Sequence, residues 1–95
     1  MSQLAERVET AMNGAGIKAR TFAALVGCHY TTIYDLLNPK NKDAVPLRIV
    51  QENIYDALDF LEAGIESAVF PLSGKLTVAQ KTQEMKRLYT VYKAK

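Results

Sequence analysis

The chain has 95 residues, of which 48% are hydrophobic and 23% are charged, and its formal net charge is +2. This balance is typical of one packed domain and differs from the polar, highly charged composition of a disordered chain. No apolar run approaches the roughly 18 residues of a membrane-spanning helix, and the start, MSQLAERVE, lacks the basic-then-apolar pattern of a signal peptide. The one cysteine, Cys28, has no intrachain partner, which favours a reducing, cytoplasmic setting.

The apolar spacing is helical almost throughout, and it predicts an all-α fold that begins with three short helices. Ser2 is suited to cap the first helix, and the glycines within residues 13–16 are expected to end it. The second helix is predicted over Ala19–Val26 and the third over Tyr30–Leu37. Proline at the second position after the third helix stops it, because proline pushes its predecessor out of helical geometry.

A longer helix is predicted from Pro46, which suits a first helical turn, to about Ala63, with Gly64 closing it. Ile49 and Phe60 lie together on one side of this helix. A separate, narrow apolar stripe is expected to face the core, and it consists of Leu47, Val50, Ile54, Ala57, Leu58 and Leu61. Two apolar faces on one helix predict two contacts, one with the core and one elsewhere.

Residues 65–76 contain two helix breakers, Pro71 and Gly74, and are predicted to form a linker. Thr77 and Gln80 then fit a capping box, in which each side chain bonds to the backbone amide of the other residue. One side of the helix within residues 77–95 carries Val78, Thr82, Met85, Leu88, Tyr89 and Tyr92. This amphipathic, basic helix is predicted either to complete the core or to form a dimer contact.

Charge is distributed in bands along the chain. Residues 43–66 carry six carboxylates and one cation, whereas residues 67–95 carry six cations and one carboxylate. Attraction between these two bands assists packing within one chain or between two chains, weakly where the charges are exposed. The residues predicted for a dimer contact are Ile49, Phe60, Met85, Leu88, Tyr89 and Tyr92.

Residues 19–38 fit a helix-turn-helix unit. A small residue, Ala23, falls where the two helices pack closest, and Gly27 falls at the turn, where a positive φ is needed. The inward positions that form the shared core are occupied by Phe22, Val26, Cys28, Ile33 and Leu36. On these residues the chain resembles the lambda-repressor/Cro-like (XRE-type) helix-turn-helix family of DNA-binding regulators.

The resemblance covers residues 1–63 and implies a DNA-binding domain within residues 1–64, with the helix-turn-helix unit at 19–38. It implies a repressor-like transcriptional regulator of prokaryotic or phage origin. Such a protein binds a double-stranded operator as a homodimer, because two-fold dimers match palindromic half-sites. The helix at 30–37 is then expected to lie in the major groove.

The predicted DNA contacts fall into base readers and backbone contacts. The start of the third helix approaches base edges in this family, so Tyr30, Thr31, Tyr34 and Asp35 are the expected readers. Residues suited to the flanking phosphates are Arg20, His29, Lys40 and Lys42. For Asp35, an ion pair or a solvated charge is an equal alternative, and for His29 and the lysines the alternative is ordinary solvent exposure.

The third helix departs from the usual DNA reader in one respect. It contains no arginine, lysine, glutamine or asparagine before Asn38, so the commonest bidentate base contacts are missing. Tyrosine is favoured at protein interfaces, and the same fold serves protein contacts. The alternative prediction is therefore a protein-interaction module on a helix-turn-helix fold, such as a phage-encoded inhibitor of a host protein.

No catalytic role is predicted. Cys28 and His29 form no metal set and no nucleophile with a base, and Cys28 is most simply a small core residue. The carboxylates of the long helix are spread around a solvated face, and no glycine-rich phosphate loop is present. We expect neither a metal nor a cofactor.

Overall fold

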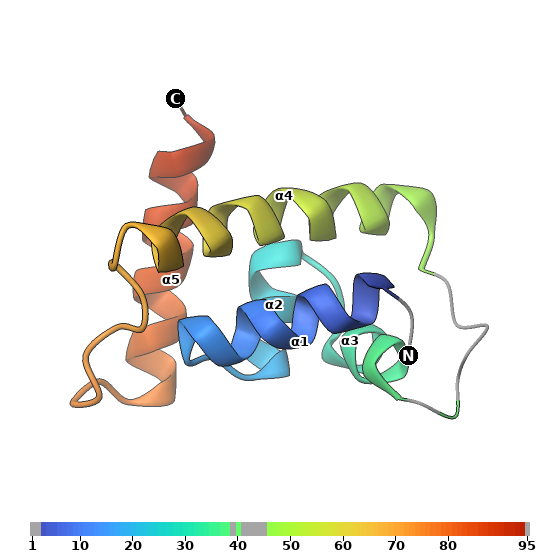
Figure 1. The fold of residues 1–95 in the computed structure, drawn as a ribbon, viewed down its shortest axis with the longest axis horizontal. Helices are drawn as coiled ribbons and strands as arrows, with labels where there is room; N and C mark the ends of the chain where they lie inside the picture. Colours follow the sequence, from blue (N-terminus) through green and yellow to red (C-terminus); the bar gives the residue numbers. More distant parts are fainter. Residues whose placement is uncertain (1–2, 39, 41–45, 95) are drawn as a thin grey trace.

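The computed structural model describes residues 3–38, 40 and 46–94, and over these residues the chain is all-helical. The helices are α1 (Gln3–Ala15), α2 (Ala19–Val26), α3 (Tyr30–Leu37), α4 (Arg48–Glu66) and α5 (Val78–Lys93). Figure 1 shows α4 running along the length of the molecule beside α1, with α2 and α3 beneath it and α5 standing across its C-terminal end. The predicted all-α class and the predicted bounds of the second and third helices are confirmed.

One core joins all five helices. The largest fully buried side chains come from each of them: Val8 of α1, Phe22 of α2, Ile33 of α3, Ile54, Leu58 and Leu61 of α4, and Met85 of α5. Since Met85 is completely buried, α5 completes the core of the single chain. The first of the two alternatives for the C-terminal helix therefore describes its inner side.

The turn between α2 and α3 is built around Gly27. Its φ is 84°, in the left-handed region that favours glycine, and its amide donates to the Ala23 carbonyl at 2.8 Å. The Cys28 amide donates to the same carbonyl at 3.1 Å. Ala23 is buried in the core, whereas Cys28 is only half-buried at its edge.

The start of α4 differs from the prediction. The helix begins at Arg48, two residues after Pro46, and Leu47 is its N-cap residue. Leu47 is 76% exposed, so it does not belong to the buried stripe that continues through Ile54 and Leu58. A helical period places Leu47 on the stripe, but the backbone at Leu47 has not yet entered helical geometry, since its φ is −54° and its ψ is 150°.

The end of α4 also differs from the prediction, because Gly64 lies inside the helix and the helix continues to Glu66. A Cβ at position 64 would overlap the ring of Phe70. The glycine therefore serves the close approach of an aromatic ring rather than a helix end. Its carbonyl accepts the amides of Val69 and Phe70, at 2.8 and 3.1 Å, which fold the chain back onto α4.

The stretch predicted as a linker packs against the core, most deeply at Phe70 and also at Ile65 and Leu72. Phe70 is buried, and its ring meets Phe60 of α4 edge-on with the ring centres 5.4 Å apart. After this anchor, Thr77 and Gln80 form the predicted capping box, with bonds of 2.9 and 3.2 Å. The start of α5 is thus fixed by a local signal and its position by the anchored loop.

Two polar contacts connect distant helices. Thr21 of α2 and Thr82 of α5 are joined through their hydroxyl oxygens at 2.9 Å. When the Thr82 hydroxyl donates to the Val78 carbonyl, Thr21 is the donor between the two threonines. On the surface, Arg7 of α1 bonds Glu62 of α4 at 2.7 and 2.8 Å, which lowers the pKa of the Glu62 carboxyl.

Candidate nucleic-acid interface

The outward side of α3 carries the predicted base readers. Ile33 and Leu36 are buried on the inward side, whereas Thr31, Tyr34 and Asp35 are exposed. Tyr34 is 51% exposed and is the most exposed of the described tyrosines. The structure therefore brings three of the four readers together on one accessible helical face, with Tyr30 half-buried at its border.

Four of the predicted contact residues form one cluster, which we call the arginine–aromatic cluster: Arg20, His29, Tyr30 and Tyr34. The Arg20 guanidinium carbon lies 4.1 Å from the centre of the Tyr30 ring. The rest of the cluster is aromatic. The centre of the Tyr30 ring lies 4.5 Å from the centre of the His29 ring and 5.7 Å from the centre of the Tyr34 ring. A guanidinium on a ring face keeps its N–H groups free at the edges, so Arg20 remains a donor here.

His29 caps α3. Its Nδ1 accepts from the Thr31 amide at 3.3 Å and lies 2.9 Å from the Thr31 hydroxyl. Because an N–H donates to Nδ1, the proton of the neutral ring is on Nε2. The cap therefore leaves one imidazole N–H donor available, and it ties the Thr31 hydroxyl back to the start of its own helix.

The end of α3 turns at Asn38. Its amide donates to the Asp35 carbonyl at 3.3 Å, and its side-chain oxygen accepts from the Lys40 amide at 3.0 Å. Lys40 is exposed, as a backbone-contacting lysine should be. The Asp35 carboxylate takes part in no ion pair within the part of the chain that the structure describes. Lys42, the other predicted lysine, lies outside the described residues.

The residues predicted for a dimer contact separate into two groups. Phe60, Met85 and Tyr89 are at most 6% exposed and are covered within the single chain, so they belong to its core. Ile49 and Tyr92 are exposed and Leu88 is half-buried. Ile49 lies three turns before Phe60 on α4, outside the aromatic contacts that Phe60 makes with α5.

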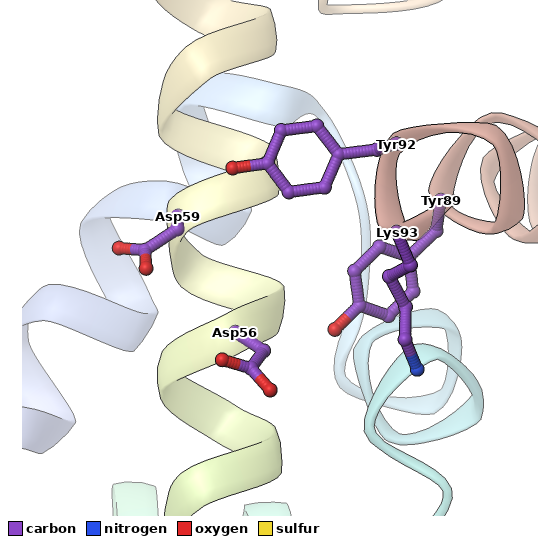
Figure 2. A pocket seen from close by; sticks show the side chains of 5 residues that line it. All are labelled: Asp56, Asp59, Tyr89, Tyr92 and Lys93. Carbon is purple, nitrogen blue, oxygen red and sulfur yellow. The ribbon is translucent and has the colours of Figure 1, made fainter. Parts of the chain in front are cut away.

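Sequence reasoning missed a pocket between α4 and α5. It is lined by Asp56 and Asp59 of α4 and by Tyr89, Tyr92 and Lys93 of α5, which Figure 2 shows facing one another across the two helices, except that the Asp59 carboxylate turns away. The available signals were a pair of carboxylates three residues apart on α4 and a Tyr-x-x-Tyr-Lys run on α5. Neither signal says by itself that the two segments meet.

No group of three or more His, Cys, Asp or Glu side chains among the described residues is arranged to hold a metal ion. None of the described helices combines the length and apolar character needed to cross a bilayer. Comparison of the chain with protein-family models, curated proteins and solved structures gave no significant match.

Proposed function

We propose that the protein is a sequence-specific, repressor-like DNA-binding transcriptional regulator of prokaryotic or phage origin. It binds an operator as a homodimer, with α3 in the major groove. The observation that carries this proposal is the accessible outward face of α3, bordered by a cation held in place. Thr31, Tyr34 and Asp35 are exposed on that face, and Arg20 lies stacked on Tyr30 beside it.

The chemistry of the residues suggests how the site reads DNA. The Tyr34 ring and the Thr31 methyl group suit thymine methyl groups, and the Asp35 carboxylate accepts from a cytosine amino group. Arg20 lies beside the start of α3 and Lys40 follows its end, so these two residues suit the phosphates of the flanking backbones. Base reading is then mainly apolar and hydroxyl-based, while orientation and much of the affinity come from the phosphate contacts.

The test is selection of binding sites from a random duplex library with the full chain, at two stated salt concentrations. We expect an enriched motif and an affinity that falls steeply with salt. Tyr34→Ala should change the motif. Tyr55→Ala is the matched control, because Tyr55 is a similarly exposed tyrosine on α4 and contacts Arg7 instead. Absence of any salt-sensitive duplex binding would overturn the proposal.

A second function, a protein-interaction module, is favoured by one observation. The outward face of α3 presents an exposed tyrosine and a carboxylate without an ion-pair partner among the described residues, and the helix itself carries no cation. Aromatic residues of this kind anchor protein interfaces. Capture from a host lysate separates the two functions. Stoichiometric recovery of one protein, insensitive to nuclease and lost in Tyr34→Ala, favours the module, and recovery of nucleic acid alone excludes it.

A further inference from the structure

The pocket between α4 and α5 has a composition that neither core packing nor DNA reading uses. Its volume is about 490 Å³, and it is open to solvent. Two carboxylates, Asp56 and Asp59, come from α4, and two phenol rings and one ammonium group come from α5 (Figure 2). Carboxylates beside aromatic faces favour a cation over an anion or a neutral group.

Tyr89 is a buried polar side chain with an open hydrogen-bonding position. The residue is only 6% exposed, and its ring packs against Phe60 with the centres 4.9 Å apart. Its hydroxyl has no hydrogen-bond partner among the described residues. Figure 2 shows that oxygen in the space between the helices, on the side where Asp56 projects from α4. No buried side-chain nitrogen or oxygen among the described residues lacks a partner, so this hydroxyl reaches the solvent of the pocket and is open to accept from a ligand.

The two carboxylates are not equivalent. Asp59 is bonded to Arg7 at 3.1 Å and turns towards α1, whereas Asp56 has no ion pair within the described part of the chain. Burial raises the pKa of the Tyr89 hydroxyl, and the negative charge of Asp56 raises that pKa further. The hydroxyl is therefore neutral at physiological pH, and Asp56 is the carboxylate of the pocket that has no ion-pair partner among the described residues.

A cation of the chain itself already lies at this position. The Lys93 ammonium nitrogen is 5.0 Å from the centre of the Tyr89 ring, within the range of a cation–π contact. Lys93 is the last residue of α5, and its side chain forms no ion pair with Asp56. The ammonium group thus lies in the pocket without using the carboxylate.

We propose that this pocket binds an organic cation, a primary ammonium or a guanidinium group, between Asp56 and Tyr89. The ligand donates to the Asp56 carboxylate and to the Tyr89 hydroxyl oxygen, and its alkyl part lies against the Tyr92 ring. Lys93 leaves the Tyr89 ring when the ligand enters. The same chemistry is offered by a free amine and by the basic side chain of another protein. The site does not depend on the proposed DNA binding.

The experiment is a titration of the full chain followed by NMR of the tyrosine rings. The probes are n-butylammonium for a free amine and N-acetyl-arginine amide for a basic side chain, with n-butanol as the neutral control. We expect saturable shifts of the Tyr89 and Tyr92 signals with at least one cation and none with butanol. The cation that binds more tightly identifies the source. Equal shifts with butanol, or none with either cation, would overturn the proposal.

Two exposed substitutions sharpen the test without endangering the fold. Lys93→Ala removes the competing ammonium group and should tighten binding by about two- to fivefold, the range expected for one exposed cation–π contact. Asp56→Asn should weaken binding, whereas Asp35→Asn, which removes the same charge from α3, should not. If Asp56→Asn and Asp35→Asn have the same effect, only net charge matters and the pocket is not the site.

Discussion

The guanidinium of Arg20 lies 4.1 Å from the centre of the Tyr30 ring, so the first turns of α2 and α3 are joined by a cation–π contact. Arg20 is the second residue of α2, and Tyr30 is the first residue of α3. The contact therefore fixes a positive charge beside the start of the helix that we propose reads DNA. A flexible arginine at the same position would have to lose side-chain entropy on binding.

Arg20→Gln is expected to weaken duplex binding and to reduce the slope of log affinity against log salt by about 1, the effect of one lost phosphate contact. Lys75→Gln is the control, since it removes one charge from an exposed position in the loop before α5. Binding isotherms at several salt concentrations measure both slopes. Equal slopes for the two variants would show that Arg20 acts through net charge alone.

Gly64→Ala is expected to destabilise the fold by about 1–3 kcal/mol, because the added methyl group overlaps the Phe70 ring. Helix propensity alone predicts the opposite sign, a gain of about 1 kcal/mol for alanine inside a helix. Urea unfolding measures the difference. The loss should shrink when Gly64→Ala is combined with Phe70→Leu, and Gly74→Ala, where a Cβ meets no atom, should change little.

Thr82→Val is expected to cost more than Thr21→Val, although each removes one hydroxyl from the same contact. Loss of Thr82 leaves the buried Thr21 hydroxyl without its acceptor, at about 1–3 kcal/mol. Loss of Thr21 leaves Thr82 bonded to the Val78 carbonyl, at about 1 kcal/mol. Thermal unfolding of the two single variants measures both losses. The reverse order would show that Thr82, and not Thr21, is the donor between them.

Glu62 gives the fold a pH dependence on the acid side. Its pKa is lowered from 4.5 by the hydrogen bond and charge of Arg7, so its contribution is complete above pH 4.5 and is lost as pH falls through the lowered pKa. The pair is partly exposed, so Glu62→Gln should cost less than about 1 kcal/mol at pH 7. The variant and the wild type should converge in acid. Glu9→Gln, at an exposed site on α1, should run parallel to the wild type.

The local features of the fold were readable from the sequence. The bounds of α2 and α3 were predicted correctly because the signals are local. The turn glycine and the apolar periodicity each determine the conformation of the residues next to them in the sequence. The capping box at Thr77 was equally local. The exposed face of α3 followed from the same helical period, which fixes the inward and outward sides together.

The errors and omissions depended on contacts between distant segments. Gly64 was predicted to end α4, because nothing local reveals that Phe70 packs onto it. Periodicity placed Phe60, Met85 and Tyr89 on apolar faces, but it could not show that other parts of the same chain cover them. The contact of Arg20 with Tyr30 and the meeting of Asp56 with Tyr89 also arise only from the placement of helices in space.

The hydrogen bond between Thr21 and Thr82 sets the smallest part of the chain that should fold on its own. Thr21 is the residue after Arg20. A hydrogen bond to α5 therefore fixes the residue next to the cation of the arginine–aromatic cluster. A fragment ending before α5 would lose this contact and would expose to solvent the apolar residues that Met85 covers. Experiments that isolate α1–α4 as a separate module would therefore begin from a destabilised protein.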